Sequence, residues 1–267
     1  MKKKLYRLTV VLLTLVLLVS GGYLVWKNLD YRRGVEIYRA ASETAGLPPV
    51  VTRPAAPAAS SPQPDEETDP LTALLASVDL AALREVNPDV TAWIVIPDTE
   101  VSYPVVQSAD NAYYLNRTWT RERSAVGAIF MECQCAPDFS GFNTILYGHR
   151  MNNESMFGVL KSYDNADFWR KHPAVYLVTD GGVSIYEVFA AHEVGIREIV
   201  YRLDVEENGW QQEFIDFCLE RSIIDAGVVP APEDKMLTLS TCTGRGHATR
   251  WVVQAVLAQT YPFPDEG

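Results

Sequence analysis

The hydrophobic residues of this chain follow three patterns along the sequence. The first is a continuous run from Leu8 to Trp26, in which every residue is apolar, small or uncharged. Nineteen such residues in a helix extend about 28 Å, which is enough to cross the hydrocarbon core of a bilayer. A cleavable signal peptide is the alternative, but the run is long for one and no small-x-small cleavage site follows it closely. The pattern therefore favours an uncleaved membrane anchor.

The second pattern is alternation of apolar and polar residues in short runs, with turn residues between them. Such runs are typical of strands that bury one face, and several in succession predict an antiparallel barrel or sandwich. We therefore expect a mainly β fold. The predicted strands are AWIVI, SYPVVQ, GAIFMEC, NTILYG, AVYLVT, VSIYEVFAAHEV, MLTLST and RWVVQAVLAQT.

The third pattern is helical spacing in three places. Residues 28–45 can continue the apolar run as a helix, and the stretch that begins at Leu71 predicts one or two short helices that end near Pro88. Residues 210–224 interrupt the strands with a helix whose buried stripe comprises Trp210, Phe214, Phe217, Cys218 and Leu219.

Composition changes sharply between Gly46 and Pro70, which hold seven of the sixteen prolines of the chain. A segment rich in Pro, Ala and Ser cannot bury a core, so we expect a semi-extended spacer that holds a folded domain away from the membrane. The predicted organisation is a cytoplasmic tail (1–7), a transmembrane anchor (8–26), a juxtamembrane segment with a Pro-rich linker (27–70) and an extracellular domain (71–267).

The distribution of charge predicts the orientation of the anchor and excludes one class of partner. Lys2, Lys3, Lys4 and Arg7 precede the apolar run, which puts the N-terminus in the cytoplasm and the rest of the chain outside the cell. Residues 1–27 hold five of the 23 basic residues and no acidic one, so the net charge of −11 becomes −16 for the remainder. A nucleic-acid partner is excluded, because phosphate binding needs clustered Lys and Arg.

A cysteine and an arginine face each other in the last two predicted strands. If these strands form a hairpin that turns about Gly246, with Gly244 also in the turn, Cys242 lies opposite Arg250 and Ser240 lies on the same face. The other face is apolar and suits a core. Register favours Arg250 over Arg245, which would sit at the tip of the turn. The alternative for Cys242 is a half-buried structural thiol.

A nucleophilic thiol needs a nearby base, and the chain has four histidines. His149 follows a strand at its end, where a barrel commonly exposes functional side chains. His247 lies in the hairpin turn and points away from the Cys242 face, and His172 and His192 are interpreted as packing or surface residues. His149 is therefore the candidate base.

The spacing of the other cysteines argues against a disulfide framework. Cys133 and Cys135 occupy alternate strand positions that point to opposite faces, which disfavours a disulfide between them, and Cys218 falls in the buried stripe of a helix. Cys133 and Cys135 alone do not provide the paired ligands of a zinc site.

Three separated motifs, in order, resemble the sortases, and specifically class B. TLSTC followed by the arginine of RWVVQAVL resembles the sortase signature, NTILYGHRMNNESMFGVLKSY resembles its histidine segment, and LREVNPDVTAWIVIPDTEVSYPVVQSADNAYYLN is similar to the class B amino-terminal region. The resemblance extends from about Leu83 to Tyr261. It implies an eight-stranded sortase-type β-barrel with N-terminal helices and a helix inserted before the cysteine strand.

The resemblance also implies a calcium-independent cysteine transpeptidase without a cofactor. Cys242 would attack a C-terminal sorting signal after threonine, His149 would protonate the leaving amine, and Arg250 would hold the substrate and the oxyanion. Residues that match Asn111, Leu115 and Ser240 line the substrate groove in the family. The implied partners are exported proteins with a sorting signal and an amine-bearing peptidoglycan precursor or pilin subunit.

The sequence departs from the family in two places and leaves two alternatives open. The segment from Cys242 to Arg250 is short, and Arg245 lies closer to the cysteine. Some class B members carry an acidic residue just after the cysteine, whereas Thr243 and Gly244 follow Cys242 here. One alternative is a cysteine peptidase or peptidoglycan transpeptidase of another fold that uses His247. The other is a non-catalytic cell-surface binding module in which Cys242 is a packing residue.

Overall fold

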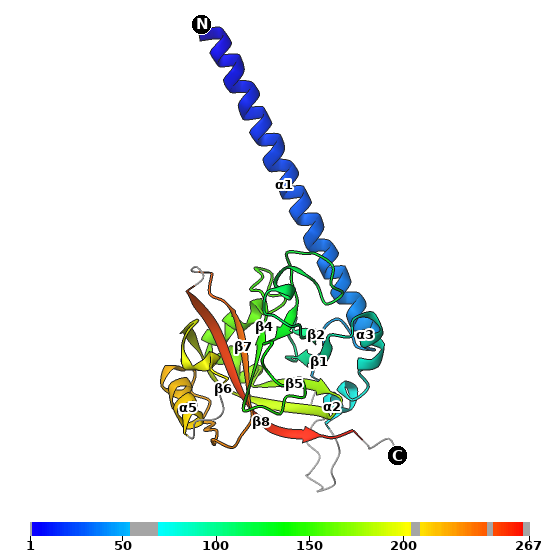
Figure 1. The fold of residues 1–267 in the computed structure, drawn as a ribbon, viewed down its shortest axis with the longest axis vertical. Coiled ribbons are helices and arrows are strands. Elements are labelled where there is room, and N and C mark those ends of the chain that lie inside the picture. Colours follow the sequence, from blue (N-terminus) through cyan, green and yellow to red (C-terminus); the bar gives the residue numbers. More distant parts are fainter. Residues whose placement is uncertain (1, 54–68, 204–208, 245–247, 264–267) are drawn as a thin grey trace.

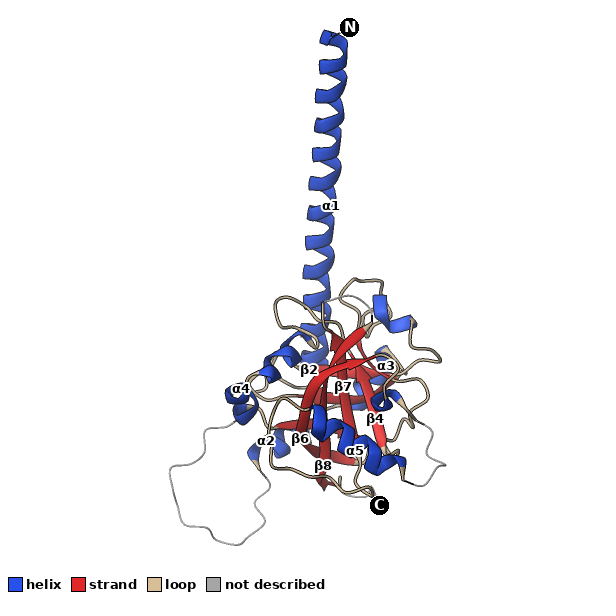
Figure 2. Cartoon of the chain, turned by 90° about the vertical axis from the view of Figure 1, so that its left-hand side faces the viewer, coloured by secondary structure: helices blue, strands red, loops and turns tan. Residues whose placement is uncertain are grey.

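A computed structural model describes residues 2–53, 69–203, 209–244 and 248–263 of the chain. Eight strands form a closed barrel in the order β1-β2-β3-β4-β7-β8-β6-β5, and helices cover its outside (Figures 1 and 2). All eight predicted strand runs are strands, so the predicted mainly β barrel is confirmed. Their bounds are β1 Val90–Val95, β2 Ser102–Val106, β3 Ile129–Met131, β4 Asn143–Tyr147, β5 Ala174–Thr179, β6 Gly182–Gly195, β7 Met236–Cys242 and β8 Thr249–Tyr261.

The sheet is mixed, which corrects the prediction of a purely antiparallel one. β2 pairs with β3 in parallel, and β4 pairs with β7 in parallel. Parallel neighbours need a long crossover connection, and the segment between β4 and β7 contains two strands and two α-helices. Alternation along a strand indicates which residues are buried, but it contains no information about which strand lies alongside.

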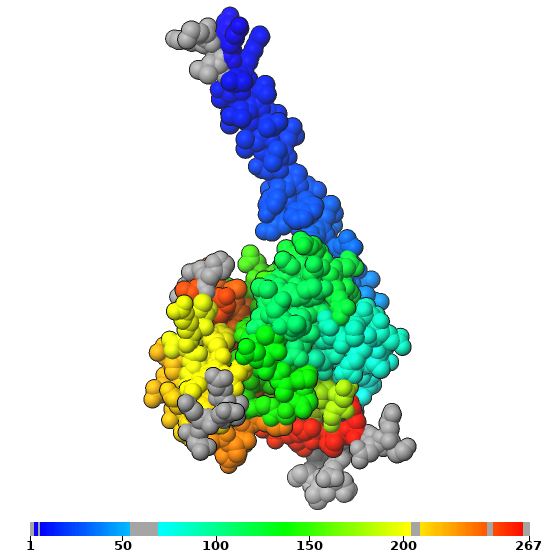
Figure 3. Space-filling model, viewed as in Figure 1, coloured from blue at the N-terminus to red at the C-terminus, as the bar shows by residue number. Residues whose placement is uncertain are grey.

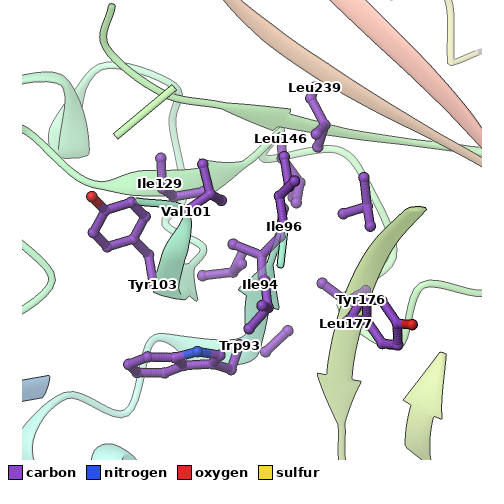
Figure 4. Close-up of a cluster of buried hydrophobic side chains, with 14 of the residues drawn as sticks. Trp93, Ile94, Ile96, Val101, Tyr103, Ile129, Leu146, Tyr176, Leu177 and Leu239 are labelled. Atoms are coloured by element: carbon purple, nitrogen blue, oxygen red, sulfur yellow. The ribbon is translucent and has the colours of Figure 1, made fainter. Parts of the chain in front are cut away.

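The barrel interior is filled by aliphatic and aromatic side chains from successive strands. Ile94, Leu146 and Leu177 have at most 1% of their surface exposed, and Figure 4 shows them in one cluster of buried side chains. The apolar face of the β7–β8 hairpin contributes to this core as predicted, because Leu237, Leu239, Trp251, Val253 and Ala255 are all buried there.

The shorter helices lie outside the barrel. Asp79 caps α3 by accepting a hydrogen bond from the backbone N–H of Ala82 at 2.8 Å. The predicted helix from residue 210 to 224 ends earlier, at Arg221, and packs mainly on β6. The α-helices are α2 Pro70–Leu75, α3 Leu80–Val86, α4 Ala166–Lys171 and α5 Trp210–Arg221, and the 3-10 helices are η1 Tyr113–Asn116, η2 Gly158–Asp164 and η3 Ile199–Tyr201.

The N-terminal helix α1, Lys2–Thr44, is continuous over 43 residues. Its apolar part projects from the globular part of the molecule (Figure 3). By length and composition it is long and apolar enough to cross a membrane, the one such helix among the described residues. Its C-terminal part packs on the barrel, where Tyr38 and Ala41 are buried.

This packing contradicts the expectation that the Pro-rich segment separates the domain from the membrane. Tyr38, which precedes that segment, and Leu47 and Val51, which lie at its start, belong to the same hydrophobic core as Leu71, which follows it. Both flanks of the segment are therefore fixed on one domain, so its length cannot set the distance to the membrane. Residues 54–68 themselves lie outside the described residues, and the predicted domain limits stay a prediction.

His192 on β6 is a buried histidine with an unusual environment. It is 1% exposed, and its Nε2 has no hydrogen-bond partner in the part of the chain that the structure describes. Burial lowers the pKa of His192 from 6.5 to about 4, because a charged imidazole loses its hydration there.

We expect this histidine to make the fold sensitive to acid. Between pH 6.5 and about 4 the unfolded chain binds a proton at this histidine that the folded chain does not. The contribution of neutral His192 to the free energy of unfolding is therefore fully present above pH 6.5 and is lost as the pH falls through this window. The loss should amount to about 3 kcal/mol. Denaturant unfolding of the wild type and of His192→Phe at pH 7 and pH 4 measures it. The variant should lose less stability than the wild type, and parallel losses would contradict the prediction.

Candidate active site

The β7–β8 pairing brings Cys242 and Arg250 together as the alternation predicted. Cys242 pairs with Arg250, Ser240 with Val252 and Thr238 with Gln254 in an antiparallel ladder without a bulge. Cys242 and Arg250 are both half-buried. The predicted turn tip, including Gly246, His247 and Arg245, lies outside the described residues.

The parallel pairing of β4 with β7 brings His149 to the same place. Tyr147 pairs with Ser240, and beyond it the backbone N–H of Gly148 donates to the carbonyl of Ser240 at 3.2 Å. The Thr241 hydroxyl donates to the Gly148 carbonyl at 2.8 Å. The chain therefore leaves β4 beside the end of β7, and His149 follows directly.

A backbone carbonyl fixes the orientation of the His149 imidazole. Nε2 of His149 lies 2.5 Å from the carbonyl oxygen of Leu115. Because a carbonyl oxygen can only accept, Nε2 carries the hydrogen in this contact. The other ring nitrogen, Nδ1, is then the atom available to exchange a proton with a reacting group.

A further contact ties the histidine segment to the cysteine strand. Arg150, the residue after His149, donates from Nη1 to the carbonyl of Thr243, the residue after Cys242. The backbone N–H of Phe157 donates to the His149 carbonyl at 3.0 Å, which closes the loop behind the histidine. Sequence reasoning missed Arg150, because its partner is 93 residues away.

All six candidate residues named in the sequence line one pocket of about 210 Å³. They come from four parts of the chain: the segment before and within η1, the end of β4, β7, and the start of β8. The pocket is lined by Asn111, Leu115, Phe130, Tyr147, Gly148, His149, Ser240, Thr241, Cys242 and Arg250.

A buried carboxylate holds one wall of this pocket. Glu132 is 8% exposed and accepts hydrogen bonds from Asn111 Nδ2 at 2.5 Å and from the Tyr147 hydroxyl at 2.8 Å. The backbone N–H of Cys133 in turn donates to Asn111 Oδ1 at 2.8 Å. Both ends of the Asn111 amide are therefore oriented. Glu132, which follows β3, could not be recognised from the sequence. The alternation of apolar and polar residues does not show whether an acidic side chain is buried or exposed.

An aromatic pair lies beside Ser240. The rings of Tyr147 and Tyr201 stack with centroids 6.4 Å apart and an angle of 12° between their planes. The Tyr201 hydroxyl lies 2.8 Å from the Ser240 hydroxyl, and burial raises the pKa of Tyr201 to about 12. Tyr201 thus stays protonated at neutral pH and keeps Ser240 in place.

Cys133 and Cys135 form no disulfide and Cys218 packs in a hydrophobic core, as predicted. Cys133, Cys135 and Cys218 are free, like Cys242. Burial raises the pKa of Cys135 to about 11 and also raises that of Cys218, which is 0% exposed. Buried thiols of this kind are poor nucleophiles.

Comparisons with known proteins agree with the geometry. The family model described as "Sortase domain" matches residues 94–258. Sortase B of Listeria monocytogenes is 33% identical over 166 residues, which cover 61% of this chain and 67% of that protein. The chain belongs to the class B sortases.

Solved structures of class B sortases share the fold of this sortase. The Staphylococcus aureus sortase B-substrate complex has a TM-score of 0.64 and 32% identity, and the match covers 68% of this chain and 85% of that one. Sortase B from Bacillus anthracis has a TM-score of 0.69 and 28% identity, covering 86% of this chain and 99% of that one. The predicted barrel with a helix before the cysteine strand is therefore confirmed, and the family makes the chain a cysteine transpeptidase.

Proposed function

We propose that this sortase is a membrane-anchored transpeptidase that cleaves a C-terminal sorting signal after threonine and transfers the exported protein to an amine. The observation that carries the proposal is the meeting of Cys242, His149 and Arg250 at one pocket. A thiol, an oriented imidazole and a guanidinium are the groups that acyl transfer through a thioester requires.

In the first half of the reaction, the Cys242 thiolate attacks the threonine carbonyl and Arg250 stabilises the oxyanion of the tetrahedral intermediate. As the C–N bond breaks, protonated His149 gives its Nδ1 proton to the leaving amine. The products are a thioacyl enzyme, a free amine and neutral His149. Leu115 supports this step, because its carbonyl accepts the Nε2 hydrogen and so holds the ring with Nδ1 available.

In the second half, the amine of a cell-wall peptide or pilin subunit attacks the thioester. Neutral His149 takes a proton from that amine, the new amide bond forms, and Cys242 leaves as the thiolate. The proposed reaction uses only side chains of this chain and its two substrates, so it requires no cofactor.

Asn111, Leu115 and Ser240 are proposed to bind the sorting signal. All three line the pocket, and hydrogen bonds that Asn111 donates to Glu132 and that Ser240 shares with Tyr201 orient two of them. A substrate complex is known for the related sortase B of Staphylococcus aureus, which supports peptide binding by this surface.

We further propose that α1 anchors the sortase with its N-terminus in the cytoplasm and its barrel outside. The apolar run ends at Trp26, and Asp30 already contacts the barrel loop through Ala125 N at 2.9 Å. Four helical residues span about 6 Å, so the barrel sits close to the bilayer. The ends of β7 and β8 that carry Cys242 and Arg250 lie on the side from which α1 projects (Figure 1), which favours capture of chains as they leave the membrane.

The test uses the full chain in detergent micelles with a library of labelled exported-protein tail peptides and an amine acceptor, followed by mass spectrometry. A thioacyl adduct on Cys242, which disappears when the amine is added, is expected for the wild type and not for Cys242→Ala. A folded wild type that forms no adduct, with Cys242 unreactive toward a mild alkylating agent, would favour the surface binding module instead.

A further inference from the structure

The side chain of His149 rests on a glycine whose replacement would displace it. Gly127 has φ of +65°, and a Cβ built on it would lie 2.6 Å from Cδ2 of His149, 3.0 Å from its Nε2 and 2.9 Å from the carbonyl oxygen of Leu115. Real Cβ atoms do not come so close to other heavy atoms. The backbone of Gly127 is therefore packed closely against the imidazole of His149. It is also packed against the Leu115 carbonyl, which is the partner of His149 Nε2.

The carbonyl of Gly127 is held by the anchor helix. The hydroxyl of Tyr38 in α1 donates to this oxygen at 2.6 Å, and Tyr38 is 6% exposed. The Tyr38 ring packs edge-on against Tyr103 of β2 with centroids 5.3 Å apart, which fixes the position of the hydroxyl. Gly127 therefore contacts α1 through its carbonyl oxygen and also lies against the side chain of His149.

The rest of the loop before β3 is docked on the same helix. Asp30 accepts from the backbone N–H of Ala125 at 2.9 Å, and the indole Nε1 of Trp119 donates to the carbonyl of Ile37 at 3.3 Å. A Cβ on Gly34 would lie 2.6 Å from Cγ2 of Val126, so helix and loop are in close contact. The loop is held at three successive turns of α1, and Gly127 cannot shift without disturbing this packing.

We infer that Gly127 and Tyr38 are positioning residues for His149, so that the juxtamembrane part of α1 sets the orientation of the imidazole at the active site. The expected effect on turnover rests on the proposed function. The placement of the His149 imidazole can be measured without turnover. Under it, α1 has a role in catalysis beyond attachment to the membrane.

The first variant is Gly127→Ala in the full chain, with Gly227→Ala as its matched control. Gly227 has φ of +67°, so alanine meets the same backbone strain there, but no atom lies within 4 Å of its Cβ position. Gly127→Ala should lower kcat by about tenfold to a hundredfold through misplacement of the imidazole, with KM changed less than about twofold. Gly227→Ala should retain wild-type kcat.

The second variant is Tyr38→Phe, with Tyr163→Phe as its control. Tyr163 is also buried and donates to a backbone carbonyl, that of His172, at 2.8 Å, so both changes remove one buried hydroxyl. We expect Tyr38→Phe to lower kcat by about fivefold, the effect of one hydrogen bond, and Tyr163→Phe to leave it unchanged.

The NMR signal of the His149 imidazole provides a readout that does not depend on turnover. It should move in Gly127→Ala and Tyr38→Phe and stay in place in both controls. The inference would be overturned if Tyr38→Phe and a folded Gly127→Ala both kept the wild-type imidazole signal and the wild-type kcat. If the wild type itself forms no adduct, the proposed function fails, while the shift of the imidazole signal still decides whether these residues position His149.

Discussion

Replacing His149 with alanine is expected to slow formation of the thioacyl enzyme at Cys242 by about 10³-fold. His149 is the proposed proton donor for the leaving amine, and positioned proton transfer contributes about 10² to 10⁴ in rate. The fold should survive, because the ring is half-buried and, within the described residues, its side-chain hydrogen bond is to the Leu115 carbonyl. Single-turnover kinetics with the preferred tail peptide, followed by mass spectrometry, measure the effect.

His247→Ala is the matched control for this experiment. It removes an imidazole five residues from the nucleophile in sequence, and the proposed mechanism gives that imidazole no role, so its rate should stay within about twofold of the wild type. The opposite pattern, in which His247→Ala abolishes transfer and His149→Ala does not, would support the peptidase alternative and contradict our assignment.

Replacing Arg250 with lysine is expected to lower kcat by about 10²-fold although the charge is kept. The guanidinium presents several donors in a fixed plane, whereas an ammonium is a point charge on a flexible stem. Loss of one oxyanion donor costs about 10² to 10³ in kcat. KM should rise as well, because Arg250 is also proposed to hold the substrate. Steady-state kinetics with one peptide over a range of concentrations separate the two parameters.

Arg245→Lys tests whether the effect is specific to position 250. Arg245 is the arginine between Cys242 and the last strand, and the same charge-preserving substitution there should leave kcat and KM close to the wild-type values. Equal losses in Arg245→Lys and Arg250→Lys would show that the loss does not depend on the position of Arg250, and the role proposed for Arg250 would be wrong.

The β7–β8 hairpin is the part of the site that could be predicted in detail. The strand period of two places Cys242 and Ser240 on one face, and a short connection leaves little freedom in the register, so the pairing of Cys242 with Arg250 followed from local sequence and is observed. The place of His149 at a strand end made it the candidate base, and the motifs added Asn111 and Leu115. All three residues line the same pocket.

The sequence by itself determined the eight strands, the faces they bury and the long N-terminal helix, because these depend on side-chain periodicity along the chain. The candidate residues followed from strand positions and from the resemblance of three motifs to the sortases. Only the tertiary structure decided which strands are neighbours. The parallel pairing of β4 with β7 joins segments about 90 residues apart, and no local pattern records such a pairing.

Tertiary structure also decided the surroundings of the reactive groups. Glu132 behind Asn111, the Leu115 carbonyl on His149, and Tyr38 on Gly127 are contacts across 21 to 89 residues of chain. Hydrogen bonds of this kind form only after the barrel brings distant loops to one end. The identity of each partner, and the docking of α1 on the barrel, therefore depend on packing in three dimensions.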